Sequence, residues 1–182
     1  NMSTKSYYHI KYRDTGKYMR AVISYDDDQG FSESITTDSI QIKKHPNNSI
    51  DNNLVKSSSS ISLNEEFKNL TLVGKQNIDG NGNSLANILT GNSGNNILSG
   101  DLGNDSLYGG NGNDTLNGGL GNDRLVGGSG KDTAVFSSSD NNINLGSIKR
   151  QTTGDGNDVL TGIENVNGGG GNDVIRGNNA AN

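Results

Sequence analysis

The chain has 182 residues and a formal net charge of −5, with no cysteine and a single proline. The acidic balance without a basic patch disfavours nucleic acid as a partner, and the absence of cysteine excludes disulfides as staples. No apolar stretch is long enough to span a membrane, and the length allows one large domain or two small ones.

Residues 1–44 show an alternation that is typical of β-strands. The runs GKYMRAVISY and FSESITTDSIQI flank the turn DDDQG, and two alternating runs around such a turn predict a β-hairpin. The acidic run at residues 26–28 is expected to be an exposed turn, with a calcium site between domains as the alternative. The segment resembles the last strands of a bacterial immunoglobulin-like or cadherin-like repeat. This resemblance implies a partial β-sandwich, because too few strands are present for a complete one.

The next two segments lead into a different kind of sequence. Residues 45–60 contain the only proline and a serine run, which predicts a linker. Residues 61–81 contain the short apolar runs ISL and FKNLTLVG. We expect them to form irregular first coils that cover the open end of the following domain.

Six uninterrupted nine-residue repeats fill residues 82–135: GNSLANILT, GNSGNNILS, GDLGNDSLY, GGNGNDTLN, GGLGNDRLV and GGSGKDTAV. A fixed short period predicts a solenoid whose units stack on their neighbours. The glycine-rich first six positions predict a tight turn, and the last three predict a short strand. The eighth position is expected to point inward in every repeat: Leu89, Leu98, Leu107, Leu116, Leu125 and Ala134.

Two repeats are expected to close one coil, so that Asp105 lies above Asp123 and Asp114 above Asp132. Stacked carboxylates repel one another unless a cation lies between them. A hard divalent ion takes about six to eight oxygens from carboxylates and backbone carbonyls, and glycine-rich turns leave their carbonyls free. The lack of cysteine, and the distance of both histidines from the repeats, favours calcium over zinc. Magnesium is less suitable, because it keeps water in a strict octahedron.

A shorter array of the same kind follows. TGDGNDVLT (residues 153–161) and GGGGNDVIR (residues 168–176) place Leu160 and Ile175 in the inward position. The six-residue unit GIENVN lies between them. The connection at residues 136–152 is expected to leave the coil and to return.

These repeats resemble the RTX family of hemolysin-type calcium-binding nonapeptide repeats. The resemblance implies an all-β fold, a calcium-stapled parallel β-roll preceded here by the partial β-sandwich or hairpin segment, with several calcium ions in rows between consecutive turns. It gives the aspartate ligand role to Asp105, Asp114, Asp123, Asp132, Asp158 and Asp173. It gives the backbone carbonyl role to Gly100, Gly103, Gly109, Gly110, Gly112, Gly118, Gly119, Gly121, Gly127, Gly128 and Gly130.

Three residues depart from the family pattern. Asn87 and Asn96 occupy the aspartate slot of the first two repeats. Asparagine is a neutral and weaker ligand, so Asn96 is retained as a candidate at the edge of the metal rows. Asp101 replaces the second glycine of its repeat.

The alternative for a tract rich in Gly, Asn and Asp is low-complexity disorder. The periodic leucine argues instead for a packed interior. Without calcium we do expect disorder, because the carboxylate rows repel and one apolar residue in nine buries too little surface. Metal binding would then supply the free energy of folding.

No GxSxG or HExxH motif is present, and we expect no enzymatic activity. The predicted function is a calcium-binding structural module of a secreted or cell-surface bacterial protein of the adhesin type, which folds on calcium binding after export. LTGIENVNGGGGND resembles a recurring stretch of large RTX surface proteins, and the family implies type I secretion. The alternatives are the non-catalytic tail of a secreted protease, lipase or alginate epimerase, and a β-roll that binds polysaccharide or ice. The expected partners are calcium and, beyond it, extracellular polysaccharide or the cell surface.

Overall fold

The computed structural model describes residues 7–8, 22–26, 32–36, 54–137 and 139–178. The chain divides into two units, Asn1–Asp51 and Asn52–Asn182. The described residues are all β and contain no helix, and so none of them forms an apolar helix that could cross a membrane. Most of the immunoglobulin-like segment and of the predicted acidic turn lies outside the described residues.

The first unit contains an antiparallel sheet of three strands in the order β1-β2-β3. They are β1 (Tyr7–Tyr8), β2 (Val22–Asp26) and β3 (Ser32–Thr36). Val22 lies opposite Thr36 and Asp26 opposite Ser32. This pairing confirms the predicted hairpin for β2 and β3.

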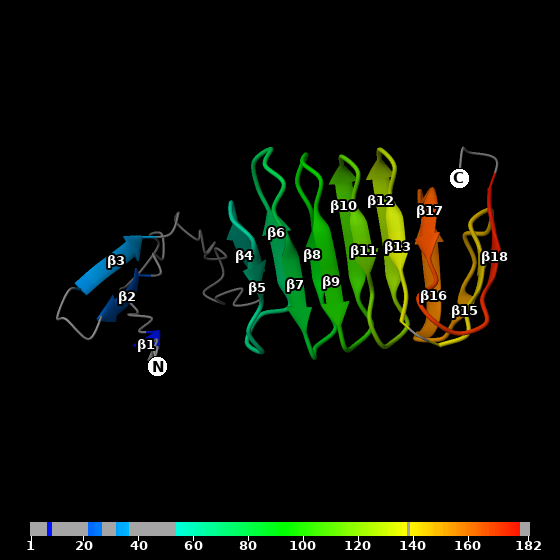
Figure 1. Cartoon of the computed structure of the whole chain (residues 1–182), viewed down its shortest axis with the longest axis horizontal. Helices are drawn as coiled ribbons and strands as arrows, with labels where there is room; N and C mark the ends of the chain where they lie inside the picture. Colours follow the sequence, from blue (N-terminus) through cyan, green and yellow to red (C-terminus); the bar gives the residue numbers. More distant parts are fainter. Residues whose placement is uncertain (1–6, 9–21, 27–31, 37–53, 138, 179–182) are drawn as a thin grey trace, which may run out of the picture. The chain divides into compact units, whose positions relative to one another are not determined.

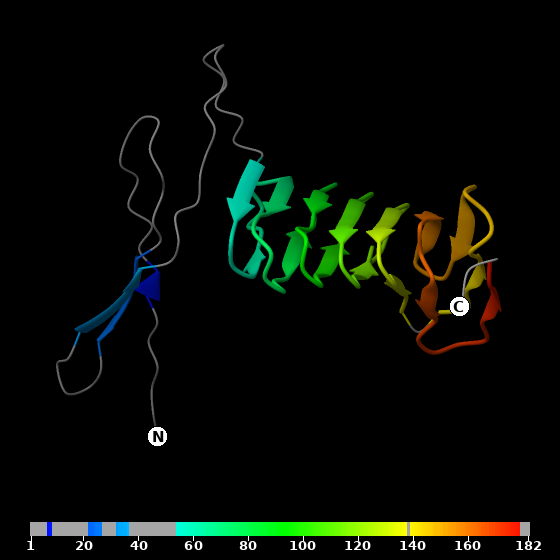
Figure 2. The ribbon, with the colours of Figure 1, turned by 90° about the horizontal axis from the view of Figure 1, so that it is seen from above.

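The second unit is a roll of parallel strands in two sheets (Figure 1). Seen from above, the strands form two rows that alternate along the stack (Figure 2). The first sheet contains β4 (Leu54–Ser57), β6 (Asn69–Leu72), β8 (Ile88–Thr90), β10 (Ser106–Asn111), β12 (Arg124–Ser129), β16 (Gly156–Thr161) and β15 (Gln151–Thr153). The second contains β5 (Ile61–Ser62), β7 (Gly80–Asn83), β9 (Ile97–Asp101), β11 (Thr115–Asn117), β13 (Thr133–Val135) and β17 (Asn165–Asn167).

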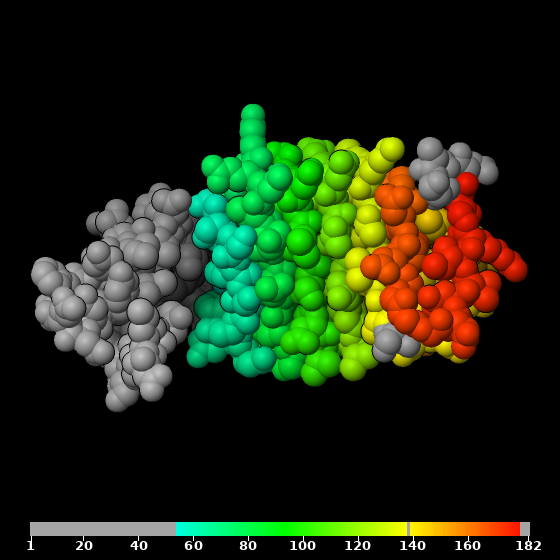
Figure 3. Space-filling model, in the orientation of Figure 1, coloured from blue at the N-terminus to red at the C-terminus, as the bar shows by residue number. Residues whose placement is uncertain are grey.

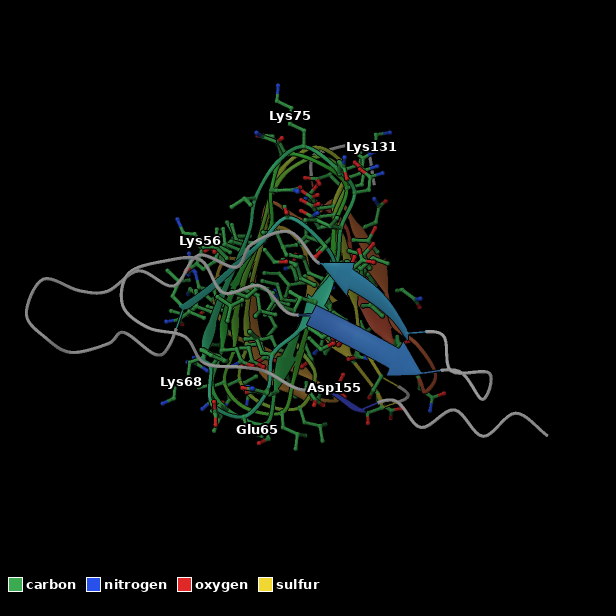
Figure 4. All side chains as sticks on the ribbon, turned by 90° about the vertical axis from the view of Figure 1, so that its left-hand side faces the viewer. Lys56, Glu65, Lys68, Lys75, Lys131 and Asp155 are labelled. Atoms are coloured by element: carbon green, nitrogen blue, oxygen red, sulfur yellow. The ribbon has the colours of Figure 1, made fainter. Side chains whose placement is uncertain are left out.

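The register confirms the predicted coil and its core. Leu107 lies opposite both Leu89 and Leu125, and Leu116 lies opposite Leu98. All six inward side chains of the repeats are 0% exposed. Viewed along the stack, side chains fill the interior of each coil (Figure 4), and successive coils pack together along the face drawn in Figure 3.

The roll begins earlier than the sequence predicted. β4 lies inside the predicted linker, yet it pairs with β6 and buries Val55 to 4% exposure. The serine run that follows forms a turn, in which the Ser57 hydroxyl donates to the carbonyl of Ser59 at 2.7 Å. The predicted boundary at residue 61 is therefore too late, because four residues of alternating burial suffice for a strand that has a neighbour.

The roll ends irregularly. β16 resumes the coil beside β12, with Leu160 opposite Leu125, and β15 returns antiparallel to β16. β14 (Asn142–Asn144) pairs with β18 (Val174–Arg176) in a separate two-stranded sheet. The prediction that Ile175 is a core residue is wrong, because β18 pairs with β14 alone and leaves Ile175 44% exposed.

Candidate metal centre

The turns of the repeats place an acidic or amide side chain at the start of the inward-facing strand triplet. These side chains form two rows, one at each turn edge of the roll. The first row is Asn87, Asp105, Asp123 and Asp158, and the second row is Asn96, Asp114, Asp132 and Glu164.

A ladder of hydrogen bonds holds each row in register. The backbone N–H of Asp105 donates to Oδ1 of Asp123 at 2.8 Å, and that of Asp123 to Oδ1 of Asp158 at 2.7 Å. In the second row the N–H of Asp114 donates to Oδ1 of Asp132 at 2.8 Å. The predicted stacking of these aspartates is confirmed. The ladder uses only one oxygen of each of these carboxylates.

The other oxygen is buried without a partner in four aspartates. Each of these residues is at most 2% exposed, and Oδ2 of each has no hydrogen bond: Asp105, Asp114, Asp123 and Asp132. A buried polar atom with no partner destabilises a fold by about 1–3 kcal/mol, and more if it is charged. Four such atoms at equivalent positions fit the binding of a cation between the turns.

Backbone carbonyls converge on the same free oxygens. A methyl group on Gly100 would lie 2.2 Å from Oδ2 of Asp105 and 2.4 Å from the carbonyl oxygen of Gly118. On Gly109 it would lie 2.4 Å from Oδ2 of Asp114 and 2.5 Å from the carbonyl oxygen of Gly127. Both distances are far below van der Waals contact, so any side chain at these positions would displace the oxygens. Only glycine leaves this space open, and the donor set fits calcium.

The remaining predicted glycines shape the turns. Seven of them have positive φ: Gly103, Gly110, Gly112, Gly119, Gly121, Gly128 and Gly130. A methyl group on Gly121 would lie 1.5 Å from the carbonyl oxygen of Gly103 in the neighbouring coil. These glycines therefore allow the turns to stack closely. Gly118 and Gly127 lie directly beside Oδ2 of Asp123 and of Asp132.

Burial disfavours the charged form of the aspartates in both rows. Desolvation raises the pKa of Asp105 and of Asp114 to about 6, although a backbone N–H lowers each. It raises the pKa of Asp123 to about 7, with repulsion from Asp158 and Asp105 adding to the effect. The pKa values of Asp132 and Asp158 are also raised, again first by burial. A cation between the carboxylates would reverse this shift by favouring the charged form.

Asn96, a predicted ligand, has both side-chain atoms bonded within the protein. Its Oδ1 accepts the N–H of Asn92 at 2.9 Å, and its Nδ2 donates to the carbonyl of Ile78 at 2.6 Å. Asn87 and Asn83 repeat this arrangement, with Nδ2 of Asn83 donating to two carbonyls of the preceding coil. The amide groups occupy the carbonyls that a cation would need, so we leave Asn96 out of the proposed ligand set.

Asp158 and Asp173 differ from the other predicted aspartates. Oδ1 of Asp158 accepts the N–H of Asp123, but its Oδ2 accepts the hydroxyl of Thr153 on β15. Asp173 lies outside both rows, and its Oδ1 accepts the N–H and the side-chain amide of Asn141.

Sequence reasoning did not assign Glu164, Gly162 or the amides of Asn83 and Asn92. Glu164 directly precedes β17 as Asp132 precedes β13, and the six-residue length of its unit hid this equivalence. The sequence signal that could have identified Glu164 is an acidic residue directly before a three-residue strand. For Asn83 and Asn92 the signal was asparagine at the second and sixth positions of one repeat.

Among the described residues, no group of three or more His, Cys, Asp or Glu side chains comes together. Any ion in these turns would take most of its ligands from backbone carbonyls. Such a donor set suits calcium and not zinc, which prefers nitrogen and sulfur.

Comparison with known families agrees with this chemistry. Residues 81–116, 99–134 and 161–182 match the family model described as RTX calcium-binding nonapeptide repeat (4 copies). The predicted resemblance of the repeats is thereby confirmed. Neither the curated proteins nor the solved structures gave a match to the chain.

Proposed function

We propose that the chain folds on calcium binding after export from a bacterial cell. Residues 81–182 contain RTX calcium-binding nonapeptide repeats, and these repeats form a β-roll, which is a calcium-binding structural module. The proposed setting is a secreted or cell-surface protein of the adhesin type, exported by type I secretion. The single observation that carries the calcium-dependent folding is the set of four buried Oδ2 atoms without partners.

The proposed ligands are the Oδ2 atoms of Asp105, Asp114, Asp123 and Asp132, together with backbone carbonyls such as those of Gly118 and Gly127. When bound, calcium supplies the partner that each free oxygen lacks and neutralises the rows. The residues themselves position these oxygens, since each Oδ1 is held by a backbone N–H of the adjacent coil. The glycines keep side chains out of the space between them.

Folding and metal binding are coupled in this arrangement. Without a cation, the roll must bury carboxylates that would be hydrated in the unfolded chain. The free energy of calcium binding therefore becomes free energy of folding. Calcium is scarce in the cytosol, and an affinity typical of extracellular modules, with Kd on the order of 10⁻⁴–10⁻³ M, would keep the aspartate turns of the roll unfolded until export.

The adhesin-type setting is supported by what precedes the roll. An antiparallel sheet, β1-β2-β3, occurs in the first unit, and the surrounding sequence resembles an immunoglobulin-like repeat. In this proposal the roll is a non-catalytic spacer between other modules.

Far-UV circular dichroism of the chain during a calcium titration after chelation tests the proposal, with magnesium as the control. We expect a cooperative gain of β-structure with calcium and little change with magnesium. A spectrum already fully folded in chelator, or indifferent to calcium, would refute calcium-coupled folding.

A further inference from the structure

The second row ends in a shortened turn. Asn165 lies opposite Thr133, so Glu164 is equivalent to Asp132 and Gly162 to Gly127. The segment from Gly127 to Asp132 has six residues, whereas the segment from Gly162 to Glu164 has three. Ile163, the residue between them, is 2% exposed and fills the interior of this coil.

The short turn nevertheless reproduces the contacts of the full turn before it. Oε2 of Glu164 accepts the N–H of Asp132 at 2.9 Å, as Oδ1 of Asp132 accepts the N–H of Asp114 at 2.8 Å. The N–H groups of Glu164 and Asn165 both donate to the carbonyl of Asp132, at 3.1 and 2.9 Å. The glutamate thus takes the structural place of the aspartate.

A carbonyl and a free carboxylate oxygen also meet at this level. A methyl group on Gly127 would lie 2.0 Å from the carbonyl oxygen of Gly162 and 2.5 Å from Oδ2 of Asp132. In the preceding turn, a methyl group on Gly109 would likewise lie next to Oδ2 of Asp114 and the carbonyl oxygen of Gly127. Independently, Asp132 is 0% exposed and its Oδ2 has no partner.

We propose that Glu164 completes a further calcium site at the end of the second row, between Asp132, Glu164 and the carbonyl of Gly162. The glutamate side chain is one methylene longer than aspartate, and this length compensates for the three residues that the turn lacks. Glu164 then has the role in the second row that Asp158 has in the first, where Oδ1 of Asp158 accepts the N–H of Asp123. The inference rests on the proposed calcium binding of the roll.

Calcium stoichiometry of the full chain, measured by equilibrium dialysis, tests the inference. Glu164→Gln keeps an oxygen that can accept the N–H of Asp132 but removes the charge. Glu66→Gln is the matched control, because Glu66 is exposed in an early coil. We expect Glu164→Gln to bind one calcium ion fewer than the wild type, and Glu66→Gln to bind the full number. Circular dichroism at saturating calcium reports whether each variant folds.

A second variant covers the case in which Glu164→Gln does not fold. Glu164→Asp keeps the carboxylate and shortens it by one methylene, so we expect it to fold and to require more calcium for one ion. Wild-type binding curves for both Glu164 variants would overturn the inference and leave calcium binding by the roll intact. A wild-type chain that takes up no calcium would refute the proposed function as well.

Discussion

The asparagine turns and the aspartate turns of this roll bury a side chain at the same position and differ in how both polar atoms of that side chain are bonded. Asn87 and Asn96 are as deeply buried as Asp105 and Asp114, at 1% exposure each. In both kinds of turn the backbone N–H donates to the side chain of the next coil. In the asparagine turns the amide nitrogen donates to protein carbonyls and the amide oxygen accepts a backbone N–H of its own repeat. In the aspartate turns the second carboxylate oxygen has no partner.

This difference shows how one fold can contain turns that need a cation and turns that do not. In the asparagine turns a second amide, that of Asn83 or Asn92, donates to further carbonyls of the preceding coil. The paired amides thus supply the donors that calcium would replace. In the aspartate turns, glycine stands in the place of the second amide at Gly110, Gly119 and Gly128. Asparagine at positions two and six marks a metal-independent turn.

Removal of calcium should produce the largest difference in stability between the aspartate turns and the asparagine turns. We expect chelation to accelerate amide hydrogen exchange in β10–β13 by at least about a hundredfold, because two or more buried oxygens without partners destabilise this region by roughly 3 kcal/mol. The strands β6 and β8, next to the asparagine turns, should lose much less protection. Hydrogen exchange followed by mass spectrometry, with and without chelator, provides the measurement. A uniform loss of protection along the roll would contradict the comparison.

Conversion of one asparagine turn into an aspartate turn should make that turn require calcium. The double variant Asn92→Gly with Asn96→Asp removes the amide donors to Gln76 and Ile78 and adds a buried carboxylate. We expect one additional calcium ion per chain and a loss of about 1–3 kcal/mol of stability in chelator. Equilibrium dialysis and urea unfolding measure the two effects.

Asn95→Asp is the control for this conversion. It adds the same charge to the same turn at an exposed position, and its side-chain oxygen can still accept the N–H of Asn113. This variant should bind no additional ion. If it gains an ion as the double variant does, net charge and not the amide pair decides where calcium binds.

The pH dependence of the calcium-free chain should also come from the aspartate turns. The folded pKa values of about 6 for Asp105 and about 7 for Asp123 lie above the ordinary value of 3.8. The folded roll therefore binds protons more tightly than the unfolded chain, and its stability rises as the pH falls from about 7 toward 4. Calcium needs the charged form, so half-saturation should require more calcium over the same range.

Circular dichroism of the chelated chain between about pH 7 and pH 5 measures this effect, which we expect as a gain of β-structure on acidification. The double variant Asp105→Asn with Asp123→Asn should show a weaker dependence, because it lacks two of the titrating groups. A calcium-free chain that loses structure on acidification would contradict the burial of these carboxylates in the roll.

Periodicity explains which features the sequence predicted. The inward Leu107 and the stacking of Asp105 on Asp123 follow from a strict nine-residue period, which places equivalent residues one coil apart. Glu164 was not assigned, because its unit is three residues short and the period fails there. Ile175 was misplaced, since a repeat pattern does not say whether another coil follows to cover it. The amide bonds of Asn92 depend on partners in another coil and have no local signal.

Asp101 should give the smallest effect, and it lies at the boundary between the two kinds of turn. It occupies the second position of its repeat, where the following repeats have glycine, and its φ of 80° is the only positive value among the described non-glycine residues. A left-handed conformation costs a non-glycine residue about 1–2 kcal/mol, of which the greater freedom of glycine in the unfolded chain offsets about half. We expect Asp101→Gly to stabilise the calcium-bound roll by roughly 0.5–1 kcal/mol in urea unfolding.

Asp101→Asn distinguishes the effect of backbone conformation on stability from the effect of the carboxylate charge. It keeps a side chain at the same positive φ but removes the carboxylate that helps to raise the pKa of Asp105. If backbone conformation is responsible, Asp101→Asn should gain little, while Asp101→Gly gains stability. Equal gains from both variants would show that repulsion between Asp101 and Asp105 destabilises this turn. The boundary of the aspartate turns would then be set by charge. Position 119 would still require glycine, because a methyl group on Gly119 would lie 1.8 Å from the carbonyl oxygen of Asp101.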